Sequence, residues 1–341
     1  MIQFQCDYNE GAHPLILERL IQTNLEQTEG YGKDHYCDAA RKIIRDACGR
    51  ADADIHFLVG GTQTNATVIS SVLKPYQGVV CAHTGHINVH ETGAIEHGGH
   101  KVLAIPSENG KLDANNLLKC IQEHYSDDGP EHMVPPGMIY ISFSTETGTI
   151  YTKEELRAIR NICSEYDIPL FIDGARLGYG LVSEGCDMTL KDLADIADVF
   201  YIGGTKCGAL CGEALVFTKN NMPEHFTTLI KSHLALGAKG RLTGVQFDAL
   251  FTDDLYFRIG RRAIDTAMRM KEIMKEKGFR LYLDSPTNQQ FFIIENSKVP
   301  ELYSKVACGF MDKYDDEHSI IRLCTSWATD MRSVEALRDV I

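Results

Sequence analysis

Short apolar runs rich in β-branched and aromatic residues recur along the first two-thirds of the chain, and longer amphipathic segments separate them. Runs of this length that are bounded by glycine or polar residues predict buried strands. They lie at 55–59, 78–82, 101–105, 138–142, 169–173, 198–202 and 213–217. Helical spacing of apolar residues appears between several of them, as at 112–124 and 153–166. The alternation predicts an α/β fold with a mostly parallel central sheet flanked by helices.

The pattern changes after Thr243. A long segment from about 253 to 277 carries isoleucine, alanine and methionine at helical spacing and ends at Gly278, which we interpret as a helix packed on the core. Shorter units follow, with strands at 290–295 and 319–324 and a closing helix from Ser333. We therefore expect an N-terminal segment and large domain over residues 1–249 and a smaller C-terminal α+β domain over 250–341.

Two of the predicted strands end in a polar side chain beside glycines. Asp173 closes one strand and precedes Gly174, and Lys206 follows Gly203-Gly204-Thr205 at the end of another. Because the carboxyl ends of parallel strands line the ligand crevice, both side chains should face one bound molecule. A lysine in this place suits a Schiff base, and a carboxylate suits the protonated ring nitrogen of pyridoxal 5'-phosphate. A surface lysine and a helix-capping aspartate are the ordinary alternative for each residue alone.

A glycine-rich turn joins the first predicted core strand to a helix. The turn starts at Gly60-Gly61-Thr62, and the helical pattern is established by Ala66. Free N–H groups and the positive end of a helix dipole make such a turn a cradle for phosphate. The turn is neither G-x-G-x-x-G nor a Walker loop, so it indicates neither a dinucleotide nor a nucleoside triphosphate. An ordinary capped turn is the alternative.

Three histidines in one stretch invite comparison with a metal site. His83, His86 and His90 are spaced as H-x2-H-x3-H, but no cysteine or carboxylate pattern of a known zinc site accompanies them. Cys207 and Cys211 form C-x3-C without a second pair. We therefore expect no metal. The histidines are then partly exposed or core residues, or one imidazole lies flat on an aromatic cofactor.

The composition indicates an acidic cytoplasmic enzyme. A formal net charge of −13 disfavours nucleic acid and anionic membranes as partners. The eleven cysteines are scattered through a chain too large for a disulfide scaffold, which favours reduced thiols. The first residues carry no basic and apolar signal segment, and no run approaches the ~20 apolar residues that span a bilayer.

These residues together resemble a known family: the low-specificity threonine aldolases and related β-eliminating lyases, among the aspartate-aminotransferase-like (fold type I) pyridoxal-phosphate enzymes. The resemblance covers nearly the whole chain, and its motifs occur in the family's order. They are Gly61-Thr-Gln-Thr-Asn65, His86 followed by Glu91 and Gly93, Asp173-Gly-Ala-Arg176, Thr205-Lys206, Lys239-Gly-Arg241 and Arg322-Leu-Cys-Thr325.

The resemblance implies a role for each cofactor-contacting residue. Lys206 forms the Schiff base with the cofactor, and Asp173 pairs with its pyridine nitrogen. His86 stacks on the ring, while Gly61 and Thr62 hold the phosphate. The cofactor implied is therefore pyridoxal 5'-phosphate, bound at the carboxyl ends of the strands.

The family also implies how the substrate and the subunits are arranged. Arg176, which lies next to the cofactor, and Arg322 would bind the substrate carboxylate, since a planar guanidinium matches it with two hydrogen bonds. A strand-edge ion pair is the alternative for Arg322. Members assemble as tetramers with active sites between subunits, so a homotetramer built as a dimer of dimers is expected. Lys239 and Arg241 would then reach a neighbour's phosphate.

Two segments depart from the family pattern. Many members carry a histidine in a Thr-His-Asn-Gly turn, where this chain has Thr145-Glu-Thr-Gly148, so Glu146 takes that place. Asp7-Tyr-Asn-Glu10 differs from the usual Ser-Asp-Thr, and we assign the substrate contact there to Asn9. Glu146 and His86 are the candidate bases for the β-hydroxyl proton. Burial would raise the pKa of Glu146 as that role requires, whereas a solvated loop glutamate is the alternative.

The expected activity is pyridoxal-phosphate-dependent aldol cleavage of a β-hydroxy-α-amino acid, such as threonine or allo-threonine, to glycine and an aldehyde. Within the same cofactor class, a β-eliminating lyase or an aminotransferase stays open. Outside that class, a phosphate-binding α/β protein without catalysis is the remaining alternative.

Overall fold

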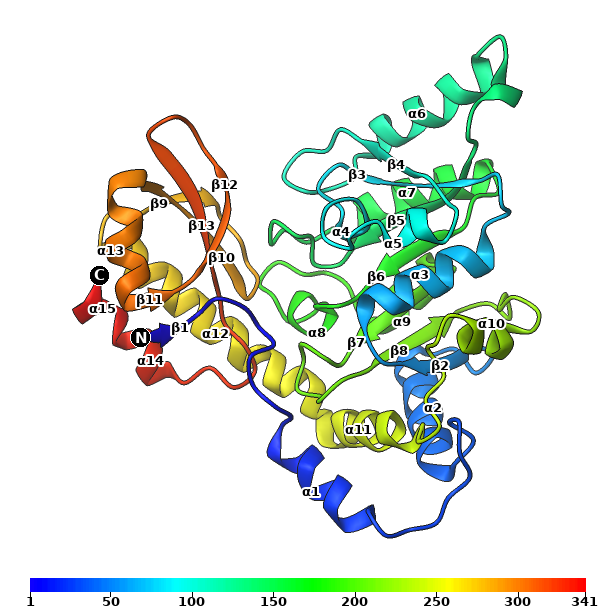
Figure 1. The fold of residues 1–341 in the computed structure, drawn as a ribbon, viewed down its shortest axis with the longest axis horizontal. Helices are drawn as coiled ribbons and strands as arrows, with labels where there is room; N and C mark the ends of the chain where they lie inside the picture. Colours follow the sequence, from blue (N-terminus) through cyan, green and yellow to red (C-terminus); the bar gives the residue numbers. More distant parts are fainter.

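Seven strands form the central sheet in the computed structural model, which describes all residues from 1 to 341. Their order is β2-β8-β7-β6-β5-β3-β4 (Figure 1). The strands are β2 (Asp54–Leu58), β3 (Gly78–Ala82), β4 (Val102–Ile105), β5 (Pro136–Ser142), β6 (Leu170–Asp173), β7 (Val199–Gly203) and β8 (Glu213–Phe217). All neighbours from β4 to β7 are parallel, whereas β8 runs antiparallel to both β2 and β7. The predicted mostly parallel sheet is confirmed. β8 is reversed because the connection from Gly203 to Glu213 is too short for a crossover helix.

Helices cover both faces of this sheet. They are α1 (Pro14–Thr23), α2 (His35–Cys48), α3 (Gly61–Val72), α4 (His86–Val89), α5 (Ala94–His97), α6 (Ala114–Ser126), α7 (Lys153–Glu165), α8 (Leu177–Gly180), α9 (Leu190–Ile196), α10 (Phe226–Ser232) and α11 (Arg241–Phe251). The larger apolar core joins one sheet face to α2, α7, α9 and α11, and a second core joins the other face to α3, α5 and α10. The inner strands β3, β5, β6, β7 and β8 are therefore buried on both sides, which explains their continuous apolar runs, whereas the edge strands β2 and β4 are only partly buried.

The C-terminal part has its own antiparallel sheet, in the order β12-β13-β10-β9. Its strands are β9 (Arg280–Leu283), β10 (Gln289–Glu295), β12 (Gly309–Lys313) and β13 (His318–Cys324). The connecting helix α12 (Leu255–Glu276) places Ile259 and Ala263 in the larger core and Met270 and Met274 in the core of this sheet. The helical spacing of apolar residues that predicted a helix packed on the core thus packs α12 against two cores.

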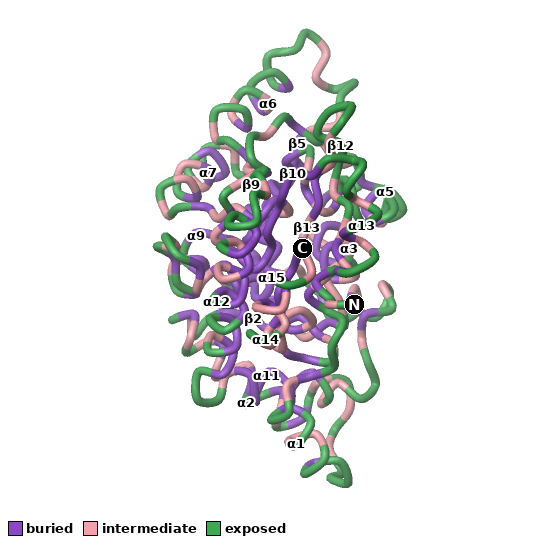
Figure 2. Tube along the Cα trace, turned by 90° about the vertical axis from the view of Figure 1, so that its left-hand side faces the viewer, coloured by how far each residue is buried: buried purple, intermediate pink, exposed green.

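Three further helices close the C-terminal part: α13 (Val299–Lys305), α14 (Met331–Glu335) and α15 (Leu337–Val340). The single closing helix expected from Ser333 is thus two short helices. In Figure 2 the buried stretches follow β5 and β10 through the middle of the molecule, while exposed stretches form its outline. No helix is both long enough and apolar enough to cross a membrane.

The first residues of the chain lie against its C-terminal part (Figure 1). β1 (Ile2–Gln3) pairs in parallel with β11 (Val306–Ala307), and Phe4 is buried in the core below β10 and β13. The carbonyl of Phe4 accepts a hydrogen bond from the backbone N–H of Cys324 at 2.8 Å. The chain then crosses to the large sheet, so residues between Phe4 and α1 pass between the two sheets.

Candidate active site

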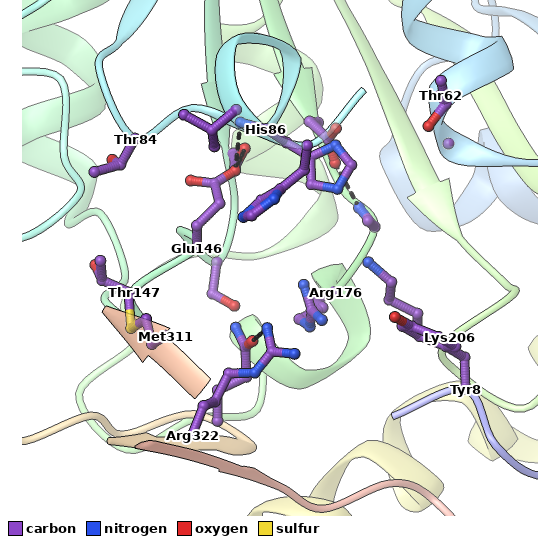
Figure 3. A pocket seen from close by; sticks show the side chains of 18 of the residues that line it. Tyr8, Thr62, Thr84, His86, Glu146, Thr147, Arg176, Lys206, Met311 and Arg322 are labelled. Atoms are coloured by element: carbon purple, nitrogen blue, oxygen red, sulfur yellow. Dashed lines mark hydrogen bonds between the residues drawn. The ribbon is translucent and has the colours of Figure 1, made fainter. Parts of the chain in front are cut away.

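A cavity of about 760 Å³ lies where the carboxyl ends of β5, β6 and β7 face the C-terminal sheet. The elements around it deliver most of the residues predicted for the site, and in Figure 3 their side chains point into one common space. The predicted residues in its wall are Gly61, Thr62, His86, Glu146, Asp173, Arg176, Lys206 and Arg322. Asn9, Lys239 and Arg241 do not line it.

Asp173 ends β6 as a buried carboxylate that is surrounded by donors. It accepts hydrogen bonds from Tyr140 Oη (2.6 Å), Tyr201 Oη (2.5 Å), Asn65 Nδ2 (2.9 Å) and the backbone N–H of Ala175 (2.9 Å). Burial acts to raise the pKa of Asp173, but the His86 imidazole and these donors outweigh it and hold the pKa below its usual value. The carboxylate therefore stays ionised although it is buried.

The His86 ring is held by a second buried carboxylate. Nδ1 of His86 lies 2.7 Å from Oε1 of Glu91, whose side chain is fully buried. Asn65 Nδ2 donates both to Glu91 (2.7 Å) and to Asp173 (2.9 Å), so one amide bridges the two carboxylates. Because Nδ1 is engaged by Glu91, Nε2 is the nitrogen of His86 that remains for a ligand in the cavity.

Lys206 follows the glycine turn after β7, and its amine takes part in no ion pair. Burial and the nearby Arg176 guanidinium lower the pKa of Lys206. The amine lies 5.9 Å from the ring centroid of Tyr8, which covers it from the N-terminal segment. A lysine with a depressed pKa is a better nucleophile toward a carbonyl group.

Arg176 is paired with Asp7, for which the sequence predicted no role. Its Nε and Nη2 donate to the two carboxylate oxygens of Asp7 at 2.7 and 3.0 Å, and both side chains are buried. The bidentate edge of the guanidinium expected to bind a substrate carboxylate is thus occupied by Asp7. Nη1 and the second hydrogen of Nη2 are left for a ligand.

Arg322, on β13, has no carboxylate partner in the protein. Its Nη1 donates to Gln289 Oε1 at 3.3 Å, and its Nη2 lies 3.5 Å from the carbonyl of Gln5. The alternative of a strand-edge ion pair is therefore not what the structure shows. Arg322 faces the cavity as a cation without an internal counterion (Figure 3).

Glu146 is fixed in the cavity wall. Its Oε1 accepts hydrogen bonds from the backbone N–H of His86 at 3.0 Å and from Ser142 Oγ at 2.5 Å. Burial raises the pKa of Glu146. Glu146 is thus a hydrogen-bonded carboxyl group rather than a solvated loop side chain. It lies beside His86, the other candidate base.

The remaining predicted residues lie elsewhere. Arg241 donates to the backbone carbonyls of Thr23 (2.6 Å) and Glu26 (2.8 Å), so its guanidinium is held at the loop between α1 and α2. The side chain of Asn9 accepts a hydrogen bond from Cys6 at 3.0 Å. Tyr8, rather than Asn9, brings the N-terminal segment to the cavity wall.

No three histidine, cysteine, aspartate or glutamate side chains are grouped so that they could hold a metal ion. His83 and His90 line the cavity together with His86, but His83 Nδ1 interacts with Ser107 Oγ at 2.9 Å. All cysteines, including Cys207 and Cys211, are free thiols.

Several residues of the site were not predicted. Tyr140 and Tyr201 are polar groups inside apolar strand runs, and Glu213 is a charged residue at the head of another. Each interrupts an apolar run in a strand whose end, or for Glu213 whose start, lies near the predicted ligand, and this is the signal that could have identified them. Asp7 carries no such local signal, because its partner is 169 residues away.

The cavity also fits an anionic ligand at the start of α3. The N-cap residue Gly60 makes no side-chain cap, so the N–H groups of the first helical turn are left for a ligand. A Cβ on Gly61 would approach Tyr201 Oη to 3.0 Å, so glycine keeps this turn open. Three buried polar atoms of the lining have no partner in the protein: Thr84 Oγ1, Ser144 Oγ and Gln289 Nε2. A polar ligand would satisfy such atoms.

Comparison with known proteins assigns the family. A family model described as β-eliminating lyase matches residues 9–296. The chain belongs to the β-eliminating lyase family. Its sequence is 26% identical to the low specificity L-threonine aldolase of Pseudomonas aeruginosa, over 99% of this chain and 96% of the relative. The threonine aldolase of Leishmania major has a solved structure that is 42% identical, covers 99% of both chains and superposes with a TM-score of 0.95.

More distant structures show the fold of this lyase. An aspartate aminotransferase of Thermus thermophilus is 13% identical, and the match covers 100% of this chain and 92% of that one with a TM-score of 0.71. The expected aspartate-aminotransferase-like fold and the resemblance to threonine aldolases are therefore confirmed.

Proposed function

We propose that this lyase uses pyridoxal 5'-phosphate to cleave a β-hydroxy-α-amino acid, such as threonine or allo-threonine, to glycine and an aldehyde. The observation that carries the proposal is the meeting of Lys206, Asp173 and His86 in one cavity with the Arg322 guanidinium, which has no carboxylate partner. A nucleophilic amine, a buried ionised carboxylate and an imidazole are the groups that this cofactor requires, and the arginine provides for an amino acid carboxylate.

The residues of the cavity fit each part of the cofactor. Lys206 would attach it, Asp173 would accept the proton of its ring nitrogen, and His86 would lie on its ring. The amides of Gly61 and Thr62 would hold its phosphate. The bound cofactor supplies an electron sink for the bond to be broken at Cα. Since four donors already contact Asp173, the ring N–H would share an oxygen with one of them or replace it.

The substrate carboxylate is best placed against Arg322. The Nη1 of Arg176 adds a second donor, and the unpartnered Gln289 Nε2 and Ser144 Oγ lie in the same wall. Together these groups would hold the amino acid in one orientation. Fixing the carboxylate decides which bond at Cα stands ready to break, which is how one cofactor supports different reactions.

Two candidate acceptors for the β-hydroxyl proton, Glu146 and His86, lie in the same cavity wall. Glu146 keeps Oε2 free while its Oε1 is held, and His86 offers Nε2 while Glu91 holds Nδ1. Either group would remove the proton as the Cα–Cβ bond breaks and the aldehyde leaves. A raised pKa on Glu146 suits a carboxylate that works as a base near neutral pH.

We further propose that the protein is a homotetramer and is located in the cytoplasm. In a homotetramer, Lys239 and Arg241 of one subunit would approach a neighbour's phosphate, since neither residue lines the cavity of its own subunit. Free thiols, found throughout the chain, are typical of cytoplasmic proteins.

Residues 1–249 would form the N-terminal segment and the cofactor-binding domain, and residues 250–341 would form the small domain.

The test is the visible spectrum of the protein with pyridoxal 5'-phosphate, before and after L-threonine, L-allo-threonine or glycine. We expect a band of lysine-bound cofactor that borohydride reduction abolishes, and formation of glycine and an aldehyde. Lys206→Ala should show neither band nor turnover, and an active Lys206→Ala enzyme would overturn the proposal. Pyruvate and ammonia as products would indicate β-elimination, dependence on a keto acid an aminotransferase, and a colourless protein a phosphate binder.

A further inference from the structure

Three consecutive residues of β12, Phe310, Met311 and Asp312, line the cavity. In a regular strand, successive side chains point to opposite faces of the sheet, so this arrangement requires an irregularity. The register of β12 against β13 shows it: Phe310 pairs with Ile321 and Asp312 with Ile320, which leaves Met311 without a partner on β13. Met311 is therefore the extra residue of a β-bulge, a feature that re-aims side chains beside active sites.

The bulge turns an apolar side chain out of the core. Ile321 is fully buried in the core of the C-terminal sheet, whereas Phe310, its partner on the edge strand β12, is 62% exposed. A phenyl ring left in water forgoes the free energy that its burial would contribute. A bound group that covers this ring would recover that free energy.

The bulge lies next to Arg322, the residue placed against the substrate carboxylate. On β13, Arg322 is paired with Gly309 of β12 and with Phe291 of β10. Gly309 has no side chain to cover the guanidinium, since a Cβ there would lie 3.7 Å from its Nε and Nη2. Phe291 and Met311 both line the cavity, so a molecule held by Arg322 has apolar surface beside it.

Other apolar residues of the wall belong to the cofactor end of the cavity. Tyr8 covers the cofactor-attaching lysine, while Ala175 and Tyr201 donate to Asp173. The apolar residues that remain in the wall come from the C-terminal sheet, apart from Val89. The proposed cofactor therefore leaves this apolar surface free for the substrate.

Met311 stands at the end of the cavity away from Lys206. In the view of Figure 3 these two residues lie on opposite sides, and Arg322 and the candidate base Glu146 lie between them. A substrate attached at the lysine end would place its carboxylate at Arg322 and its β-hydroxyl at the candidate base. The remaining substituent on Cβ would then point toward Met311.

We propose that Met311 is a specificity-determining residue that packs against the substituent on Cβ of the substrate, and that this substituent is an apolar group larger than the methyl group of threonine. This inference rests on the proposed function and names its substrate class. An unbranched thioether side chain adapts its shape, so linear, branched and aromatic substituents can all pack on it.

Charge and polarity at the same place favour an apolar substituent. Asp312 follows Met311 in the cavity wall, and its Oδ1 accepts a hydrogen bond from the backbone N–H of Lys313 at 2.8 Å. The Asp312 carboxylate would repel an anionic substituent. A substituent that carries a hydroxyl would lose hydrogen bonds to water when it packs against Met311 and the neighbouring phenyl rings.

The experiment measures how tightly the enzyme loaded with pyridoxal 5'-phosphate binds amino acids that lack the β-hydroxyl and so cannot be cleaved. α-Aminobutyrate, norvaline and leucine carry a methyl, an ethyl and an isopropyl group on Cβ, and homoserine carries a hydroxymethyl group of nearly the size of ethyl. Titration of the lysine-bound band gives the dissociation constants. We expect norvaline to bind about fourfold more tightly than α-aminobutyrate, leucine more tightly still, and homoserine about tenfold more weakly than norvaline.

Variants assign the preference to Met311. Met311→Ala should bind norvaline and α-aminobutyrate equally, whereas Met311→Leu should keep the preference because it conserves the volume and the apolar surface. Met133→Ala is the matched control, since Met133 is exposed and lies outside the cavity. The measure is the ratio of the two dissociation constants, so a general loss of affinity in a variant cancels. The same change should appear in kcat/KM for β-hydroxynorvaline relative to threonine.

Three results would each overturn the inference: equal binding of norvaline and α-aminobutyrate by the parent enzyme, tighter binding of homoserine than of norvaline, or a Met311→Ala enzyme that keeps the parent's preference. A parent enzyme that forms no lysine-bound band with pyridoxal 5'-phosphate would instead refute the proposed function, so the two failures are distinguishable.

Discussion

Asp7 and Arg176 form a buried bidentate ion pair across 169 positions of sequence, with Nε and Oδ2 2.7 Å apart. Asn288, at the edge of the C-terminal sheet, donates to the same Asp7 oxygen at 2.9 Å. One carboxylate therefore joins the N-terminal segment, the turn after β6 and the C-terminal sheet. It also decides which edge of the Arg176 guanidinium is offered to a substrate.

Replacing Asp7 by asparagine should destabilise the protein and weaken substrate binding. The change leaves the buried Arg176 without its counterion, which costs about 3 kcal/mol of unfolding free energy. Because the guanidinium is no longer fixed, KM should rise more than kcat falls. Urea unfolding and steady-state kinetics measure the two effects. Asp330→Asn, which breaks an exposed ion pair with Arg332, is the matched control and should leave both unchanged.

Asp7→Asn should also change how the stability of the protein falls at acid pH. Burial would raise the pKa of Asp7, but Arg176 holds it at about 2, below the 3.8 of an unperturbed aspartate. A group with a depressed folded-state pKa contributes stability above its unfolded pKa and loses it as pH falls toward the folded value. Asp7→Asn should therefore lose less stability than the parent protein between about pH 4 and pH 2. Equal losses would contradict the role of the pair.

Asp173→Asn should slow bond cleavage more than it weakens cofactor binding. An amide cannot hold the ring nitrogen protonated, so the electron sink fails, while the phosphate turn and Lys206 still bind. Single-turnover rates and the dissociation constant of pyridoxal 5'-phosphate give the two quantities. If they fall together, Asp173 is mainly a binding residue.

Glu91→Gln tests how His86 is held. The carboxylate accepts from Nδ1 and keeps Nε2 free, whereas a glutamine amide can donate to Nδ1 and leave the hydrogen on Nε2. If His86 is the base, kcat should fall by about 10²-fold or more, with a smaller change in KM. Glu96→Gln changes an exposed glutamate of the neighbouring helix α5 and should leave the rate intact. An unchanged kcat for Glu91→Gln would show that His86 does not need this partner.

Glu146→Gln distinguishes the two candidate bases by pH. Burial raises the pKa of Glu146, and a carboxylate base works only when ionised, so its activity should rise with pH through a value above 4.5. In Glu146→Gln that limb of the kcat/KM profile should disappear and the rate should fall. A limb that persists in the variant assigns the base to His86.

The strands of the large sheet could be predicted where packing on both faces leaves a continuous apolar run. The runs at 78–82 and 213–217 coincide with β3 and β8, and the long helix expected over 253–277 is α12. β9 and β12 were missed because they are short strands whose residues are exposed or only partly buried, so neither forms a continuous buried apolar run. β1 has only two residues, and it exists because β11, far along the chain, pairs with it.

The residues of the candidate site also fall into those with a local sequence signal and those without one. Lys206 and Asp173 could be found because a strand end and its glycines are local features. Tyr140 and Tyr201 carry only a weak local signal, a hydroxyl inside an apolar run, because the carboxylate that they contact comes from another strand. Asp7 could not be assigned, since its role depends on a pairing that only the folded chain creates.

The pairing of β1 with β11 has a consequence for the order of synthesis. Residues 2 to 7 are made before their partners, Asn288 and Val306–Ala307, and Asn288 follows Asp7 by 281 positions. The large sheet can form while these early residues still lack their neighbours. The active site is therefore completed only once β11 has been made, and a nascent chain halted before β11 would hold Lys206 and Asp173 in a site with neither its N-terminal wall nor Arg322.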